Sequence, residues 1–163
     1  TVKSWIGVLE RTGVIHLLRP YTDGSPVKRM TKRPKMYFWD TGLACHLAKV
    51  TDAASLKAGY LRGPMVETYI VNEIMKSHCN NGRSTGFHYF RDQGNEIDLV
   101  MASDGVLTLV ECKSGMTYDA KDVKAFDRLD RSLLRVGPSC LVCLTEKMYP
   151  LRKDVYALPV TSI

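Results

Sequence analysis

The chain has 163 residues, of which 45% are hydrophobic and 25% are charged. These proportions are typical of a globular protein with one sizeable core or two small ones. No apolar run is long enough to cross a bilayer, and no signal peptide precedes the first element. We therefore expect a cytoplasmic protein without a membrane partner.

The net charge of +6 is unevenly placed along the chain. Residues 1–40 hold eight Lys or Arg against three Asp or Glu, a net +5, which leaves only +1 for the remainder. This asymmetry favours the N-terminal segment as the surface for an anionic partner such as nucleic acid.

The predicted elements of the first third begin with a short amphipathic helix over residues 1–12, ended by Gly13. Two extended runs follow, 14–18 and 35–39, separated by a turn-rich stretch, and a helix followed by such a hairpin is typical of the end of a winged helix. Asp40 or Thr41 can cap a further helix through Leu47. The opening on Thr1, without an initiator Met, suggests a fragment of a longer protein.

The polar stretch 51–57 suggests a boundary between two segments, a winged-helix-type segment with a connecting helix over 1–58 and a second domain over 59–163. The second segment has the pattern helix, three strands, helix, strand, and its predicted elements cover 64–78, 87–91, 96–101, 106–113, 118–134 and 140–145. Asp104-Gly105 is a strong hairpin signal between the second and third strands. The order αβββαβ indicates the α/β (α+β) class with a mixed central sheet.

Charged side chains of the predicted strands 96–101 and 106–113 are expected to converge. Strand alternation places Glu96, Asp98 and Val100 on one side of their strand, and Glu111 and Lys113 on one side of the next. Asp98 and Glu111 can then hold one hard divalent cation, with the backbone carbonyl of Cys112 as a further ligand. The ammonium of Lys113 would position or activate the attacking water.

Glu67 adds an independent signal from the helix. At helical spacing it points between Ile70, Val71 and Ile74, in the middle of the apolar face. A carboxylate on an apolar helix face lacks a polar partner. A metal-bound water shared with Asp98 would supply one. The alternative for each charged residue is structural: solvated strand ends for Asp98 and Glu111, an ammonium of Lys113 that reaches solvent, and an ion pair of Glu67 with Arg62 or Arg91.

These residues resemble the PD-(D/E)xK nuclease superfamily, in which an Asp, a Glu-x-Lys and often a helical Glu form the active site. The resemblance rests on Glu67, on 95–100 (Asn-Glu-Ile-Asp-Leu-Val) and on 109–113 (Leu-Val-Glu-Cys-Lys). It implies a restriction-endonuclease-like core, with Glu67, Asp98, Glu111 and Lys113 as the catalytic residues and with Mg²⁺ or Mn²⁺ held by Asp98, Glu111, Cys112 and Glu67. Ile97 stands where the superfamily pattern has Pro.

More narrowly, the chain resembles the C-terminal DUF4143 region of a group of prokaryotic AAA-type ATPases. The motifs are Pro34 to Leu43, Gly63 to Glu73, Tyr89 to Asp92 and Glu111 to Gly115, and together they span nearly the whole chain. The resemblance implies that an ATPase module precedes Thr1 in the full-length protein. ATP would bind only there, and oligomers would form through that module.

A basic segment precedes the second extended run and is interpreted as the wing of a winged helix. Its phosphate contacts would give salt-sensitive DNA binding, with the helix over 1–12 facing a groove. The nucleic-acid residues expected on this basis are Lys3, Arg11, Lys28, Arg29, Lys32, Arg33 and Lys35. The alternative is a solvated loop, or one that docks onto the ATPase.

Three other features carry less functional signal. Cys140 and Cys143 have zinc or redox spacing, but an offset of three in a strand aims their sulfurs at opposite faces, and no second pair completes a site. The five cysteines are odd in number and scattered, as expected of reduced thiols. Tyr89, Phe90 and Arg91 could stack on bases, although aromatic residues of a central strand more often fill a core.

The sequence leaves two main functions open, and with them the question of whether the chain is an enzyme. The first is metal-dependent hydrolysis of a nucleic-acid phosphodiester. The second is a non-catalytic module that binds DNA or protein and regulates an AAA-type ATPase.

Overall fold

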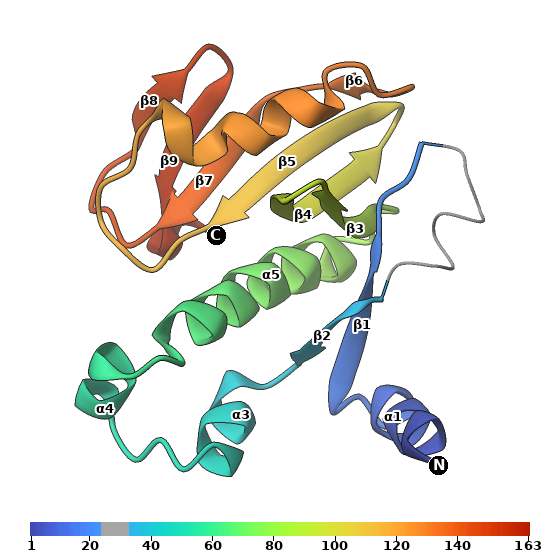
Figure 1. Cartoon of the computed structure of the whole chain (residues 1–163), viewed down its shortest axis with the longest axis vertical. Coiled ribbons are helices and arrows are strands. Elements are labelled where there is room, and N and C mark those ends of the chain that lie inside the picture. The colour runs from blue at the N-terminus through green and yellow to red at the C-terminus, as the bar shows by residue number, and fades with distance from the viewer. Residues whose placement is uncertain (24–32) are drawn as a thin grey trace.

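One mixed sheet runs through the part of the chain that the structure, a computed structural model, describes: residues 1–23 and 33–163 (Figure 1). Within these residues the sheet has nine strands in the order β2-β1-β3-β4-β5-β7-β9-β8, and β6 pairs with β5. The strands are β1 Ile15–Pro20, β2 Lys35–Phe38, β3 Gly86–Asp92, β4 Asn95–Ser103, β5 Val106–Cys112, β6 Arg135–Val136, β7 Ser139–Cys143, β8 Tyr149–Arg152 and β9 Val155–Pro159. The α/β class and the mixed sheet are confirmed, and the hairpin β8–β9 extends the sheet beyond the predicted elements.

The helices are α1 Val2–Arg11, α3 Thr41–Leu47, α4 Ala53–Ala58, α5 Arg62–Asn80, and the 3₁₀ helices η1 Ala120–Leu129 and η2 Val160–Ser162. Asp40 caps α3 as predicted, because its carboxylate accepts a 2.7 Å hydrogen bond from the N–H of Leu43. Most of the polar stretch 51–57 belongs to α4, which Asp52 caps through the N–H of Ser55. None of the helices in the described ranges is long and apolar enough to cross a membrane.

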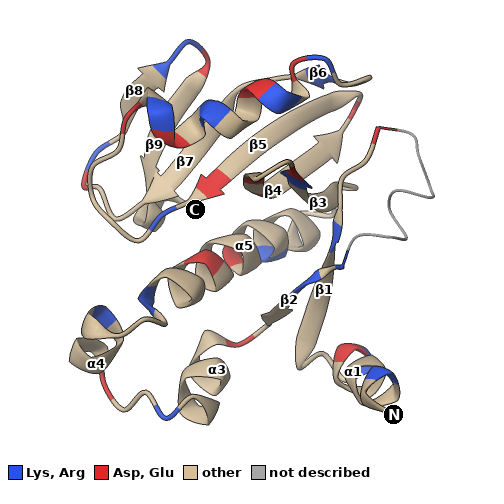
Figure 2. Ribbon diagram, viewed as in Figure 1, with Lys and Arg blue, Asp and Glu red and all other residues tan. Residues whose placement is uncertain are grey.

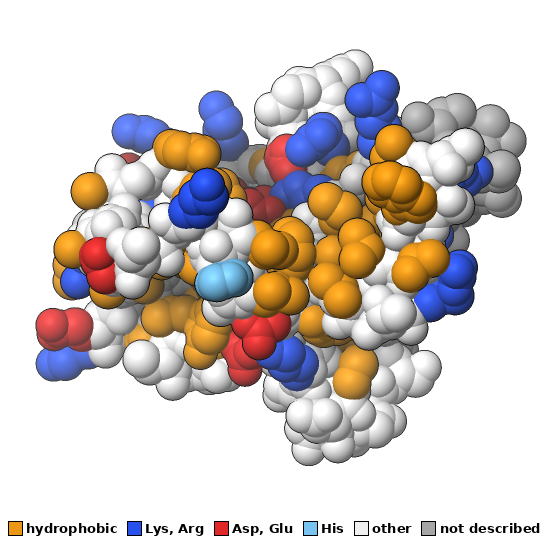
Figure 3. Space-filling view, turned by 90° about the horizontal axis from the view of Figure 1, so that it is seen from below, with side chains coloured by type: hydrophobic (Ala, Val, Ile, Leu, Met, Phe, Trp, Pro, Cys, Tyr) orange, Lys and Arg blue, Asp and Glu red, His pale blue; other side chains and the backbone are white. Residues whose placement is uncertain are grey.

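The N-terminal hairpin is part of the main sheet. β1 pairs with β2 in antiparallel fashion and with β3 in parallel fashion, through Arg19 opposite His88 and Pro20 opposite Tyr89. The predicted segments 1–58 and 59–163 therefore share one sheet. α1 lies outside it without a buried residue, and Trp5 on this helix is 73% exposed. Figure 3 shows hydrophobic side chains gathered on the face seen from below.

Two core clusters lie on opposite faces of the sheet. On one face, α5 packs Ile70, Val71 and Ile74 against Leu99 and Val110. On the other face, η1 supplies Val123, Phe126 and Leu129, which pack against a second set of strand residues that includes Ile97, Val100 and Leu109. The alternation of Leu109 and Val110 between the clusters is the period-two pattern of a strand buried on both faces.

A bulge in β4 interrupts this alternation beside the candidate site. His88 stands opposite Val100 and Phe90 opposite Ile97, so Asp98 and Leu99 together face Tyr89. The extra residue re-aims the strand. Ile97 and Val100 consequently lie on the η1 face, and the prediction that Val100 shares a side with Asp98 is wrong. The predicted turn is present, because Asp104 and Gly105 both have positive φ, 51° and 75°, and connect β4 to β5.

Candidate functional site

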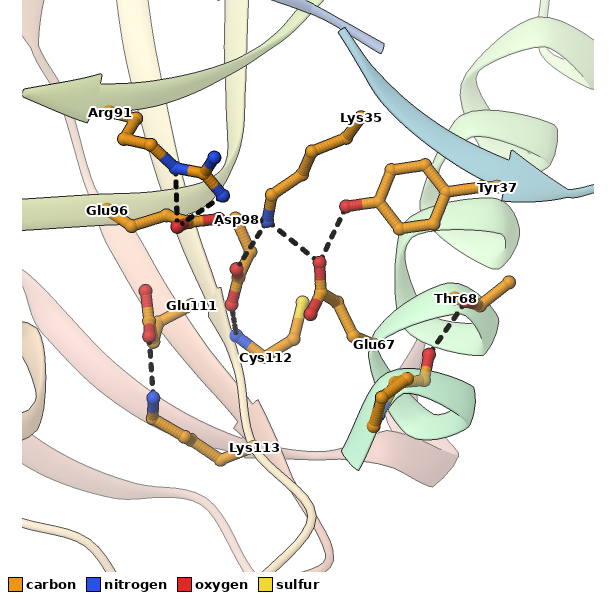
Figure 4. Close-up of polar contacts among 11 residues, drawn as sticks. Lys35, Tyr37, Glu67, Thr68, Arg91, Glu96, Asp98, Glu111, Cys112 and Lys113 are labelled. Carbon is orange, nitrogen blue, oxygen red and sulfur yellow. Dashed lines mark hydrogen bonds and ion pairs between the residues drawn. The ribbon is translucent and has the colours of Figure 1, made fainter. Parts of the chain in front are cut away.

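Lys35 lies at the centre of a cluster of carboxylates (Figure 4). Its Nζ is 2.9 Å from Oε1 of Glu67 on α5 and 2.9 Å from Oδ1 of Asp98 on β4, and it also forms an ion pair with Glu96. The Lys35 side chain is 14% exposed. One ammonium of β2 thus joins acids from a helix and a strand that are distant in the sequence.

Strand alternation in β2 explains how Lys35 reaches this position. Lys35 and Tyr37 are two residues apart and point to the same face of the strand, and Tyr37 belongs to the core cluster that contains α5. The Tyr37 hydroxyl donates a 2.6 Å hydrogen bond to Oε1 of Glu67. The acid predicted on the apolar face of α5 is therefore satisfied by β2, and Arg62 instead donates to the carbonyl of Ser114.

The charges of this cluster support one another. Burial works against the ammonium of Lys35, but the negative charges of Asp98 and Glu67 outweigh it and raise the pKa of Lys35 well above its ordinary value. Burial works against the Glu96 carboxylate as well, yet hydrogen bonds from Lys35 and Arg91 bring its pKa below the ordinary value. The ammonium of Lys35 and the carboxylate of Glu96 are consequently held in their charged forms at neutral pH.

Asp98 joins this cluster to β5. Its Oδ1 accepts from Lys35, and its Oδ2 accepts a 3.0 Å hydrogen bond from the N–H of Cys112. The β4–β5 ladder ends nearby at Leu99 opposite Val110. The Asp98 carboxylate thus extends the connection between the two strands where backbone pairing stops.

Glu111 and Lys113 form a second, adjacent group. The Lys113 ammonium lies 2.8 Å from Oε1 of Glu111, whereas the buried Oε2 has no hydrogen-bond partner among the described residues. Burial and the charge of Asp98 outweigh Lys113 and raise the pKa of Glu111 to about 7. Figure 4 shows both side chains extending to one side of β5, while the sulfur of Cys112 points to the other side, toward Glu67.

The four acid and lysine residues predicted for the site thus occupy one region, but as two groups. The carboxylate oxygens of the three acids are ligands of the kind that Mg²⁺ and Mn²⁺ prefer, and the unpartnered Oε2 of Glu111 suits a cation. Within residues 1–23 and 33–163, however, no three His, Cys, Asp or Glu side chains are placed to hold one metal ion together. The ammonium of Lys35 holds Glu67 and Asp98 instead. The donor chemistry fits the predicted metal, and the present arrangement of Glu67 does not.

A cavity of about 310 Å³ opens beside the carboxylate cluster. Its lining includes Lys35, Tyr37, Glu67, Arg91 and Glu96. Figure 2 shows charged residues of both signs along α5 and at the end of β5 that faces it. The site is therefore polar and accessible to a charged ligand.

The predicted nucleic-acid residues are found in different places. Lys3, Arg11 and Arg33 are exposed, the first two on α1 and the third just before β2. Lys35 was predicted as a phosphate contact, but it is engaged by three carboxylates. Lys28, Arg29 and Lys32 lie outside the described residues.

The other residues singled out in the sequence are packed within the fold. Cys140 and Cys143 are free thiols, and burial raises the pKa of both. Tyr89 is 1% exposed and donates to the carbonyl of Arg33, so its ring does not face solvent. His16 is buried and hydrogen-bonded to Asn72.

The roles of Lys35, Tyr37 and Glu96 in this cluster do not follow from the sequence pattern. Two signals were available: the spacing of Lys35 and Tyr37 on one strand face, and an acid, Glu67, on an apolar helix face that needs a partner. Neither signal identifies its partner, since the pairing depends on how β2 is placed against α5.

Comparison with known proteins gives two family matches. Residues 62–163 match a family described as a domain of unknown function (DUF4143), and residues 1–54 match another, DUF8612. No curated protein sequence matches the chain. The crystal structure of protein VC1899 from Vibrio cholerae is similar over 96% of this chain at 14% identity and a TM-score of 0.40. The chain covers 45% of that protein.

Proposed function

The chain belongs to the DUF4143 family, and we propose that it is a nuclease-like, DNA-binding module with a PD-(D/E)xK site made of Glu67, Asp98, Glu111 and Lys113. The observation that carries the proposal is the buried, unpartnered Oε2 of Glu111. Burial and then the nearby charge of Asp98 raise the pKa of Glu111. A cation shared by the two acids would remove that repulsion.

The groups of the chain suit phosphodiester hydrolysis. A Mg²⁺ or Mn²⁺ ion held by Asp98 and Glu111 would neutralise phosphate charge and acidify a bound water. Lys113 keeps its ammonium beside Glu111, where it would orient the attacking water and counter the negative charge that develops on the phosphate. Asp98 is fixed by the N–H of Cys112, which limits how far its carboxylate can move.

Binding to DNA would come from basic residues outside the acidic cluster. Lys3, Arg11 and Arg33 are exposed cations among the described residues, and the sequence adds Lys28, Arg29 and Lys32. Contacts of this kind give affinity that falls steeply with salt and depends little on base sequence. We further propose that an ATPase module of the full-length chain supplies ATP binding and any oligomerisation.

A second function is favoured by the position of Lys35. The ammonium of Lys35 already engages Glu67 and Asp98. A module without metal chemistry would need such an internal cation to neutralise its acids. In that case the chain would bind DNA or protein without cutting, and would target or regulate the ATPase.

A cleavage assay separates the two functions. Supercoiled plasmid and a labelled duplex would be incubated with the purified chain and Mg²⁺ or Mn²⁺. The variants Asp98→Asn and Lys113→Met would be compared with the matched control Lys121→Met, at an exposed lysine of η1. Hydrolysis requires cleavage that both site variants lose and the control keeps. Salt-dependent binding without cleavage, unchanged in Lys113→Met, would instead support the second function.

A further inference from the structure

We propose that Lys35 is an internal counter-ion that competes with a divalent cation for Glu67 and Asp98. The inference deepens the proposed function and rests on it, because it concerns how metal enters the same site. It assigns Lys35 to control of metal affinity, in place of the DNA contact expected from the sequence.

The first argument is the match between donors and acceptors. A lysine ammonium has three N–H donors and no acceptor. The three oxygens near Lys35 Nζ are Oε1 of Glu67, Oε1 of Glu96 and Oδ1 of Asp98, and the Tyr89 ring centroid lies 5.8 Å away. The ammonium is thus surrounded by negative oxygens and an aromatic ring, which is the environment of a bound cation.

The second argument is that the ammonium and a metal ion would share ligands. Two of the three oxygens that contact Lys35 Nζ belong to Glu67 and Asp98. These two residues are also the proposed metal ligands from α5 and from β4. A dication on the same oxygens would lie within a few ångströms of the ammonium, where like charges repel strongly. Metal bound by Glu67 and Asp98 together therefore requires Lys35 to leave.

The third argument is the charge count of the site. Four carboxylates, those of Glu67, Glu96, Asp98 and Glu111, face three cations, those of Lys35, Arg91 and Lys113. Their net charge is −1 when all four carboxylates are ionised. A site so nearly neutral attracts a divalent cation only weakly, and Lys35 is the cation placed against two proposed ligands. Its removal should increase metal affinity more than removal of another cation of the cluster.

The test is a titration of the chain with Mn²⁺ by calorimetry, without DNA. Lys35→Met is expected to bind Mn²⁺ about tenfold or more tightly than the unmodified chain, and Mn²⁺ should raise its melting temperature more. Arg91→Met is the matched control, since it removes the same charge but leaves Lys35 against Glu67 and Asp98. Its Mn²⁺ affinity should change much less.

A double variant keeps the test valid if Lys35→Met does not fold. Lys35→Met with Glu96→Gln removes one charge of each sign, so the net charge and the proposed metal ligands are unchanged. It should still bind Mn²⁺ more tightly than the unmodified chain, because the position between Glu67 and Asp98 is vacated.

The outcomes distinguish the inference from the proposed function. Equal or weaker Mn²⁺ affinity in both Lys35 variants, or an equal gain in Arg91→Met, overturns the inference, and metal-dependent cleavage by the unmodified chain would then leave the function standing. Absence of Mn²⁺ binding at millimolar concentration in every protein would overturn both.

Discussion

The hydroxyl of Tyr37 and the ammonium of Lys35 converge on the same oxygen, Oε1 of Glu67. Two residues of β2 thereby satisfy an acid that α5 presents from its apolar side. Because burial and the charge of Glu67 both raise the pKa of Tyr37, the phenol stays protonated and remains a donor throughout the neutral range.

The Tyr37→Phe substitution should destabilise the chain by about 1–3 kcal/mol, because the half-buried Glu67 carboxylate loses a charged hydrogen bond while the ring volume is kept. Urea unfolding at pH 7 measures the change. Tyr60→Phe, at a residue that is 89% exposed, is the control and should be neutral. A loss below about 0.5 kcal/mol for Tyr37→Phe would contradict the role assigned to this hydroxyl.

Glu111 should make stability fall as pH rises from about 4.5 to about 7. Its folded pKa of about 7 lies above its ordinary value of 4.5, so over that window the unfolded chain has lost the proton that the folded chain still holds. The stabilisation is complete below the unfolded pKa and is lost as pH passes the folded pKa. Glu111→Gln mimics the protonated acid and should be more stable at pH 8 by about 1–3 kcal/mol.

The check on Glu111 is a series of urea titrations between pH 4 and pH 8. The difference between the unmodified chain and Glu111→Gln should grow across that window, while the exposed Glu146→Gln should show no comparable trend. A difference that stays constant with pH would rule out Glu111 as the source.

Asn72 should be among the most sensitive polar positions. It is 1% exposed, its amide nitrogen donates to the carbonyls of Phe38 and Trp39, and its amide oxygen bonds to His16. Asn72→Leu would leave these buried groups without partners, at a cost of about 2–4 kcal/mol. Thermal unfolding compared with Asn80→Leu, at the exposed end of α5, measures the effect; equal melting temperatures would contradict it.

Two glycine substitutions should act in opposite directions. Gly105 has φ +75° and Gly63 lies in α5 with ordinary φ, and neither would meet an atom within 4 Å on gaining a Cβ. Gly105→Ala should therefore cost about 1–2 kcal/mol through backbone strain alone, whereas Gly63→Ala should gain up to about 1 kcal/mol. Changes of the same sign in denaturant unfolding would contradict the conformational argument.

The parts of the fold that follow from local chemistry could be predicted from the sequence. The Asp104-Gly105 turn and the Asp40 cap are set by a few adjacent residues, and the helical periodicity that places Glu67 on the apolar face of α5 is likewise local. η1 is an intermediate case. Its buried residues Val123, Phe126 and Leu129 recur every three residues, a spacing that suits a 3₁₀ helix, although the sequence pattern predicts a longer helix over 118–134.

The features that depend on distant pairing could not be predicted in this way. The bulge at Asp98 and Leu99 is a change of register between β3 and β4, between His88 and Phe90. No property of the β4 sequence alone requires it. Lys35 lies in a basic stretch of the sequence, which suggests a contact with phosphate. Only its position against Glu67 and Asp98 in the fold gives it another role. Alternation and charge identify candidates, whereas the partner of each depends on the sheet.

The parallel pairing of β1 with β3 joins segments about seventy residues apart in the chain, so it should form late in folding. Until it forms, β3 has an uncovered edge whose free backbone groups can pair with a strand of another molecule. A piece cut at residue 59 would keep that edge permanently. It should therefore aggregate more readily than the longer chain, even if its own helices and strands fold correctly.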